Sequence, residues 1–278
     1  MKLGLGLGIN KGVIVTNLFK DATLAFSLRD LGLGADYAVR VRRDSDNAEQ
    51  DFTANEITDG TLEGFVGSGN GYVSIWYNQI GGNDAIQNTA TQQPMIVNGS
   101  GNLITKLGKP AIYMTEGLYL FVDNPSIVTV ENGIESYVVF SVDGSPSKNK
   151  GIFGKWGGTK DEYALLNDSK LKVTSKDTNN IQTNTESNYL LNSETALIEA
   201  RFNFSFQEVL RNQISLIKNQ INDVLVSDNK LTIGTYTLKN SQFTTVDSYY
   251  QDLVIFKTKN SGKQTEIRKN INDYYGIY

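Results

Sequence analysis

Apolar and polar residues alternate in short runs along most of the chain, and glycine- and asparagine-rich segments separate these runs. Residues 37–42 (YAVRVR) alternate with a period of two, which is typical of a half-buried strand. Residues 136–142 (SYVVFSV) form the most strand-like run, which we place in the centre of a sheet. Further strands are expected at residues 73–77, 111–114, 118–122, 151–156, 163–166, 171–174, 231–234 and 250–256. The pattern predicts an all-β protein built from many short strands.

Three segments are expected to break the strand pattern. Asp21 can cap a short helical turn over residues 22–31. Residues 176–188 are rich in Asn, Thr and Ser and are expected to form a long loop. Residues 264–275 repeat apolar positions at helical spacing, and Gly276 would close this C-terminal helix.

Residues 206–226 fit two structures. A helix is indicated by the spacing of Leu210, Ile214, Ile217 and Ile221. Two strands at residues 196–202 and 214–218, with a turn at residues 219–220, fit the same sequence. The spacing alone favours the helix, but the surrounding segments are β-rich, so we predict strands.

The first twenty residues differ from the rest of the chain. Glycines at positions 4, 6 and 8 alternate with the apolar residues Leu3, Leu5, Leu7 and Ile9. A phosphate-binding glycine loop is excluded because the third glycine of that motif would fall on Ile9 or Lys11. We expect residues 1–20 to form an extended arm that docks on a partner, and residues 21–278 to form one domain. A first strand of that domain, or a frayed terminus, fits the arm segment equally well.

The composition excludes several kinds of chemistry. The 278 residues include no Cys and no His, which excludes disulfides, thiolate nucleophiles, imidazole metal ligands and Ser-His-Asp triads. Carboxylate pairs, Lys, Tyr and backbone groups remain as reactive or binding groups. The net charge of −4 argues against a nucleic-acid partner. No cofactor is indicated, and no run of about 20 apolar residues could span a membrane.

Two tryptophans are candidate carbohydrate contacts, because aromatic faces stack on sugar rings beside polar groups. Trp156 ends a predicted strand before two glycines, and Asp161 and Tyr163 follow it. Trp76 precedes a turn at residues 78–84 that carries amides and a carboxylate. In both places, a structural role in the core or at a corner of the sheet is the alternative.

An acidic loop is a weak candidate for a calcium site. Asp44, Asp46 and Glu49 offer oxygen ligands at closely spaced positions. The loop lacks the glycine and the distal glutamate of an EF-hand, and Arg42 and Arg43 lie beside it. Local pairing with arginine is therefore the favoured interpretation, and no metal site is predicted.

Several segments resemble the catalytic domain of the α-L-arabinofuranosidase B family and its phage and bacterial relatives. They are residues 25–31 (AFSLRDL), 38–52 (AVRVRRDSDNAEQDF) and 75–87 (IWYNQIGGNDAIQ). The later part of the chain also resembles the concanavalin A-like (laminin G-type) jelly roll, at residues 152–158 (IFGKWGG), 216–220 (LIKNQ), 231–234 (LTIG), 251–256 (QDLVIF) and 274–278 (YYGIY). The resemblance covers about residues 21–278. It implies a concanavalin A-like (laminin G-type) jelly roll, in which two antiparallel sheets pack face to face.

The chain departs from the hydrolases of that family at their active site. Their disulfides are absent, and Asp161 and Glu162 lie in a different context where the catalytic glutamate of the family is expected. No catalytic residue is therefore predicted. The resemblance extends to virion proteins of phages, which carry such domains in fibres and spikes.

These features together predict a non-enzymatic virion surface protein. The arm would dock on other virion proteins, the jelly roll would hold host glycan, and the protein would assemble as a homotrimer in the virion. A glycoside hydrolase of the arabinofuranosidase type is the alternative. A capsid or penton protein with only protein contacts is a further alternative.

Overall fold

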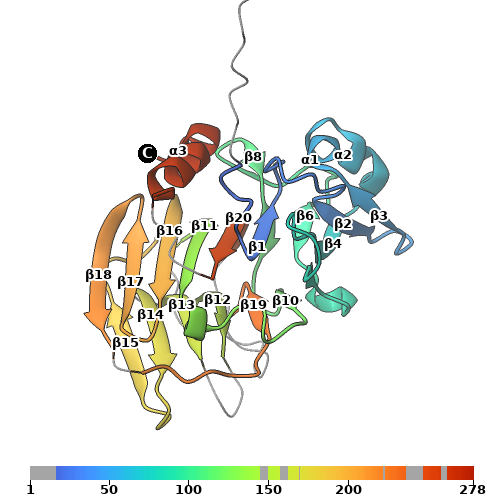
Figure 1. The fold of residues 1–278 in the computed structure, drawn as a ribbon. Coiled ribbons are helices and arrows are strands. Elements are labelled where there is room, and N and C mark those ends of the chain that lie inside the picture. Colours follow the sequence, from blue (N-terminus) through green and yellow to red (C-terminus); the bar gives the residue numbers. More distant parts are fainter. Residues whose placement is uncertain are drawn as a thin grey trace, which may run out of the picture.

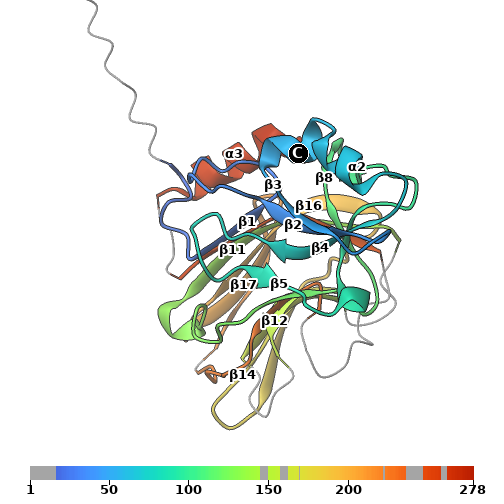
Figure 2. The same ribbon diagram turned by 90° about the vertical axis from the view of Figure 1, so that its right-hand side faces the viewer.

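The computed structural model describes residues 17–144, 150–156, 162–168, 170–221, 223–235, 247–257 and 262–278. Two antiparallel β-sheets, called sheet I and sheet II below, pack face to face around an apolar core (Figure 1, Figure 2). One C-terminal helix, α3 (Gln264–Tyr275), lies outside sheet I. The predicted all-β sandwich with a C-terminal helix is confirmed. None of the helices in the described residues is long and apolar enough to cross a membrane.

Sheet I is centred on two nine-residue strands. These are β11 (Ile134–Val142), which is buried along its whole length, and its neighbour β20 (Ser248–Phe256). Beyond β11 the order is β16 (Glu194–Phe202), β17 (Phe206–Arg211) and β18 (Ile214–Gln220). On its other side, β20 pairs with β1 (Leu24–Ser27) and β9 (Ile112–Met114).

Sheet II contains more strands, and most of them are short. Its order is β15 (Gln182–Glu186), β14 (Lys170–Lys176), β13 (Tyr163–Asp168), β12 (Lys150–Lys155), β19 (Leu231–Ile233), β10 (Leu120–Val122), β5 (Ala85–Ile86), β4 (Gly71–Trp76), β2 (Val39–Arg43) and β3 (Glu49–Phe52). Strand β6 (Met95–Val97) pairs with both β4 and β9, so it connects the two sheets at one corner.

Smaller elements decorate the loops between these strands. They are the helices α1 (Ala54–Thr58) and α2 (Thr61–Val66), the 3₁₀ turns η1 (Ala90–Gln92) and η2 (Val130–Asn132), and the hairpin of β7 (Thr105–Lys106) and β8 (Lys109–Pro110).

The two faces of sheet I pack against different partners, because successive residues of a strand point to opposite sides. Val138 and Phe140 of β11 point inward to the core shared with sheet II. Tyr137 and Val139 point outward and pack under α3. Phe19, only 3% exposed, joins this outer cluster. The arm residues Leu3, Leu5, Leu7 and Ile9 lie outside the described residues, so the docking arm stays a prediction.

The structure corrects three local predictions. The segment predicted as a helical turn at residues 22–31 contains strand β1, whose four residues are all buried and pair with β20. The segment predicted as a long loop contains strand β15. The strands predicted at residues 196–202 and 214–218 are present as β16 and β18, but the unpredicted strand β17 lies between them. The turn between β17 and β18 lies at Asn212–Gln213, where both residues have positive φ (47° and 72°), and residues 219–220 belong to β18.

Candidate functional site

Two of the predicted carbohydrate contacts are buried in the core, which corrects that prediction. Trp76 is on the inward face of β4, fully buried, and its ring centroid lies 5.6 Å from that of Phe26. Tyr163 is fully buried on β13, with its ring centroid 4.9 Å from that of Phe202. Burial also raises the pKa of the Tyr163 hydroxyl well above its ordinary value. Neither ring can contact a ligand at the surface.

The other two predicted contacts are not tested in the same way. Trp156 follows β12 and is partly exposed, and the Lys176 Nζ lies 5.1 Å from its ring centroid. Asp161 lies outside the described residues. A ligand role for Trp156 and Asp161 stays a prediction.

Glu162 is the described one of the two carboxylates that lie where the resemblance expects the catalytic glutamate of the family, and it is buried in an ion pair. Its Oε2 lies 2.7 Å from the Lys155 Nζ, and both side chains are at most 1% exposed. Its Oε1 accepts a hydrogen bond from the Val130 N–H at 2.7 Å. Lys155 also donates to the Pro125 carbonyl at 2.7 Å. The burial raises the pKa of Glu162, although Lys155 opposes this shift. The pair ties β12 to the loops around it and gives a substrate no access.

The acidic loop is organised by local pairing, as favoured above. The Arg43 guanidinium donates two hydrogen bonds to Asp46, at 2.8 and 2.7 Å, and it holds the pKa of Asp46 well below its usual range. Asp44 accepts hydrogen bonds from the backbone and side chain of Asn70. Glu49 is exposed on β3. Within the described parts of the chain, no group of three or more acidic side chains could hold a metal ion.

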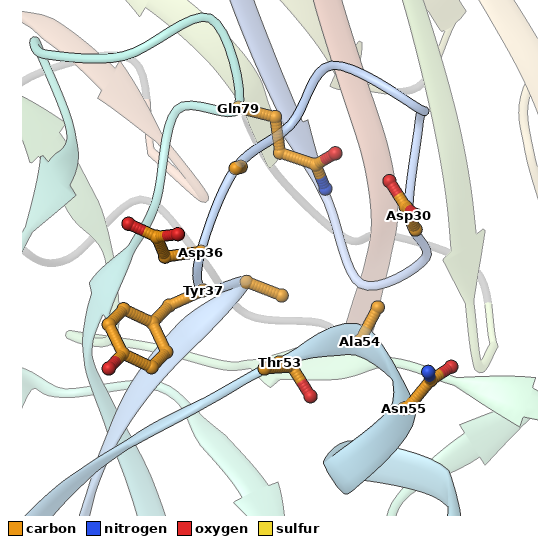
Figure 3. Close-up of a pocket in the computed structure, with 9 residues that line it drawn as sticks. Asp30, Asp36, Tyr37, Thr53, Ala54, Asn55 and Gln79 are labelled. Atoms are coloured by element: carbon orange, nitrogen blue, oxygen red, sulfur yellow. The ribbon is translucent and has the colours of Figure 1, made fainter.

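A hollow lies between the loop before β2, the start of α1 and the loop after β4 (Figure 3). It consists of two adjoining volumes of about 100 and 360 Å³, which share Ala35, Asp36, Tyr37 and Gln79. We call it the Tyr37 groove. Asp30 and Asp36 lie on opposite sides of it, and Asn55 lies at its α1 end (Figure 3).

Two buried amides hold the walls of the Tyr37 groove in place. Gln79 accepts a hydrogen bond from the Leu31 N–H at 2.9 Å and donates to the Arg29 carbonyl at 2.8 Å. The Asn78 side chain accepts a hydrogen bond from the Ala25 N–H at 2.8 Å, and the backbone N–H of Asn78 donates to the Asp84 carboxylate at 2.9 Å. The loop after β4 is therefore fastened to the loop that carries Asp30.

The loop that carries Asp30 is also held by contacts with sheet I and helix α3. The Arg29 Nε donates to the Asp252 carboxylate of β20 at 3.1 Å, and both side chains are at most 9% exposed. The Arg29 guanidinium lies 4.9 Å from the ring centroid of Tyr274 on α3. The groove wall thus rests on both sheet I and the C-terminal helix, which makes it preorganised for a ligand.

Two tyrosines form the aromatic side of the groove. Tyr37 is 43% exposed, and its ring centroid lies 6.0 Å from that of Tyr77. The Tyr77 hydroxyl donates to Asp51 at 2.6 Å, and Arg40 donates two hydrogen bonds to the same carboxylate, at 2.7 and 2.8 Å. Tyr77 is thereby fixed as a backing for the exposed ring of Tyr37.

The turn that the sequence predicts after Trp76 lies beside the Tyr37 groove, but Trp76 itself does not. The turn at residues 78–84 does line the groove, whereas the ring beside it belongs to Tyr77 and not to Trp76. The alternation along β4 places these two neighbours on opposite faces. Tyr37 gave no separate signal, because it begins a run that alternates like any half-buried strand.

Known proteins resemble this chain in fold. A GH54 α-L-arabinofuranosidase soaked with a cyclic sulfate inhibitor matches with a TM-score of 0.62 and 12% identity, over 90% of this chain and 62% of that chain. An arabinofuranosidase complexed with arabinofuranosyl-α-1,2-xylobiose matches with a TM-score of 0.61 and 12% identity, over the same shares. The receptor-binding domain of botulinum neurotoxin D matches with a TM-score of 0.50 and 11% identity, over 93% of this chain and 53% of that chain.

These matches define the class of the protein as a β-sandwich of the kind found in that arabinofuranosidase. The chain spans about 62% of the length of the arabinofuranosidases. At 12% identity the likeness shows the fold alone. No protein-family model matches the sequence, and no curated protein matches it either.

Proposed function

We propose that the protein binds carbohydrate without cleaving it, and that the Tyr37 groove is the binding site. The observation that carries the proposal is the exposed Tyr37 ring, backed by Tyr77, in a groove with Asp30 and Asp36 on opposite sides. Aromatic faces stack on the C–H groups of a sugar ring, and carboxylates accept hydrogen bonds from its hydroxyls. The rigid walls limit the entropy lost on binding.

Hydrolysis of arabinofuranosides is the second candidate function. The fold is similar to that of arabinofuranosidases, and the groove carries carboxylates on both sides. Glycosidases need one carboxyl group whose pKa is raised so that it can act as an acid. Among the described carboxyl groups, Glu162 has a raised pKa, but it is enclosed with Lys155 and cannot reach a sugar. Glu162 is therefore not available as the acid of such a reaction.

The proposal includes a place for the protein on the surface of a phage virion, with the jelly roll outward and assembly as a trimer. Its support is the sequence resemblance to phage virion proteins and the Leu-Gly alternation at the start of the chain. A version that begins at residue 17 should fold as well as the full chain but fail to join particles. If the shortened chain unfolds, the first residues are an integral part of the domain and the docking role is excluded.

A glycan array combined with an aryl-arabinofuranoside assay tests the choice between binding and hydrolysis. We expect array binding by the purified chain and no turnover. Tyr37→Ala should weaken the best glycan about 5-fold, since an aromatic contact contributes on the order of 1 kcal/mol. Tyr278→Ala is the matched control, because Tyr278 is 44% exposed and lies outside the groove.

The outcomes separate the candidates. Turnover that Asp30→Asn or Asp36→Asn abolishes would establish the hydrolase instead. An array without binding, together with no turnover, would overturn both functions. Equal loss of binding in the Tyr37 and Tyr278 variants would show that the glycan does not bind in the Tyr37 groove.

A further inference from the structure

A second hollow of about 430 Å³ shares no lining residue with the Tyr37 groove. Its lining residues are Met95, Asn98, Leu103, Ile104, Thr105, Lys106, Tyr113, Asp247 and Tyr249. We call it the Tyr113 cavity. It combines an apolar side with two aromatic rings, a carboxylate and a lysine, and the proposed carbohydrate function does not use it.

Two tyrosine–aspartate pairs stand side by side here, and all of their residues except Asp143 line the cavity. Tyr113 of β9 and Tyr249 of β20 are cross-strand neighbours, and their ring centroids are 5.4 Å apart. The Tyr113 hydroxyl donates to Asp247 at 2.6 Å, and the Tyr249 hydroxyl donates to Asp143 at 2.8 Å. The Asp143 N–H also donates to the Asp247 carbonyl at 3.0 Å, which sets the two aspartates next to each other.

One of the two pairs already holds an ammonium group. The Lys106 Nζ lies 2.6 Å from the Asp143 Oδ1 and 3.9 Å from the ring centroid of Tyr249. An ammonium is attracted both by the face of an aromatic ring and by a carboxylate, and these attractions add when the two lie together. This half of the cavity shows the arrangement that such a cation adopts here.

The other pair has the same aromatic and acidic parts without a cation from the described residues. No described lysine or arginine forms an ion pair with Asp247, whose side chain bonds to the Tyr113 hydroxyl. Asp143 and Lys106 balance each other, so Asp247 leaves this cluster of described side chains with one negative charge. Met95, Leu103 and Ile104 supply apolar surface beside it.

We propose that the Tyr113–Asp247 half of the cavity binds an alkylammonium group, that is, a primary amine on a hydrocarbon stem. The ammonium would bind Asp247 and the Tyr113 ring, as the Lys106 ammonium binds Asp143 and Tyr249. The stem would pack on the apolar side, as a lysine stem packs on apolar surface. A small aliphatic amine and the lysine side chain of another protein share this chemistry.

Titration with n-butylammonium, followed by NMR chemical shifts and calorimetry, tests the proposal. n-Butanol is the uncharged probe of equal stem length. Nα-acetyl-lysine amide, compared with n-butylammonium, distinguishes a lysine side chain from a small aliphatic amine, and glucosamine is an ammonium without a hydrocarbon stem. We expect n-butylammonium to bind one site at about millimolar affinity, which rising salt weakens, and at least 10-fold more tightly than n-butanol. Asp247→Asn should weaken n-butylammonium about 10-fold, whereas the exposed Asp228→Asn should not change it.

The half of the cavity that holds the Lys106 ammonium supplies an independent test, in which the expected result is a gain of binding. Lys106→Met removes the resident ammonium but leaves Asp143 and Tyr249, so the variant should bind two n-butylammonium ions instead of one. Unchanged stoichiometry in this variant, butanol binding as tight as n-butylammonium, or an Asp247→Asn variant that binds normally would each overturn the proposal. Equal affinity for glucosamine and n-butylammonium would show that the hydrocarbon stem makes no contribution to binding, and would overturn that part of the proposal.

Discussion

Acidic side chains play opposite roles beneath α3 and in the Tyr37 groove. Under the helix, Glu135, Glu199 and Glu208 are at most 7% exposed, and all three bond to the guanidinium of Arg201 at 3.0–3.2 Å. In the groove, Asp30 and Asp36 are exposed on opposite sides of the hollow. The same residue type therefore holds an element in place in one region and faces solvent, open to a ligand, in the other.

The difference follows from what burial requires of a charge. A carboxylate removed from water is stable only when cations and hydrogen-bond donors replace its hydration. Burial by itself would lower the pKa of Arg201, but Glu135 and its neighbours raise it above the ordinary value. Arg268 of α3 adds two hydrogen bonds to Glu199, at 2.8 and 2.7 Å, which fasten the helix to sheet I. An exposed carboxylate keeps its hydration and needs no such partner.

The largest effect on stability is expected from Arg201→Met. The substitution keeps most of the side-chain volume but leaves Glu135 and Glu208 buried without their guanidinium. Removing one partner of a buried ion pair costs about 3–5 kcal/mol, so urea unfolding should show a loss in this range or above it. The free energy of unfolding is the quantity to compare between variants.

Arg43→Met is the control for Arg201→Met. It removes an ion pair to Asp46 in which the two side chains are 32% and 51% exposed, and water screens such exposed pairs so that they add little to stability. Its loss of stability should therefore be much smaller than that of Arg201→Met. If the two variants lose equal stability, the contrast between the buried and exposed acidic groups does not hold.

A smaller loss is expected from Lys155→Met, which leaves the single carboxylate Glu162 without its cation. We expect about 3 kcal/mol, again from urea unfolding. The double variant Lys155→Met with Glu162→Leu should recover part of this loss, because it removes the stranded charge. Additive losses in the double variant would contradict the pairing, since groups in contact are expected to couple.

The sequence predicted the long elements of the fold better than the short ones. Strand β11 and helix α3 were expected because their patterns extend over 7 to 12 residues. The sequence of strand β1 does not reveal a strand, because four buried residues show no period and its partner β20 lies more than 200 positions away. The helix α1 was missed, although the capping box of Thr53 and Glu56 marks its start in the sequence.

The candidate sites were less predictable, because distant contacts create them. Tyr113 and Asp247 are 134 positions apart, and nothing local in either segment indicates that they meet. Trp156 and Tyr163 were chosen for their sequence neighbours, but the register of β13 turns Tyr163 into the core. Alternation shows that neighbouring residues of a strand face opposite sides, whereas the side that faces the core depends on packing.

The smallest expected effect concerns Tyr113. This side chain is half-buried, so its burial is intermediate between that of the glutamates beneath α3 and that of the aspartates in the Tyr37 groove. Burial and the hydrogen bond to Asp247 raise its pKa to about 12. The folded state therefore keeps the proton longer than the unfolded state, whose tyrosine ionises near pH 10. The stability that this proton contributes is complete below pH 10 and is lost as the pH rises through about 12.

Ultraviolet titration of the folded chain, taken as the difference between the native protein and Tyr113→Phe, isolates this hydroxyl. We expect its midpoint near pH 12, with circular dichroism used to confirm that the chain is still folded. In an Asp247→Asn background the midpoint should fall toward 10, because the carboxylate that accepts the hydrogen bond and repels the phenolate is gone. A native midpoint near 10 would show that the Tyr113 hydroxyl is as well hydrated as that of an exposed tyrosine. The Tyr113 cavity would then resemble the solvent-exposed Tyr37 groove and would not be intermediate between that groove and the buried cluster beneath α3.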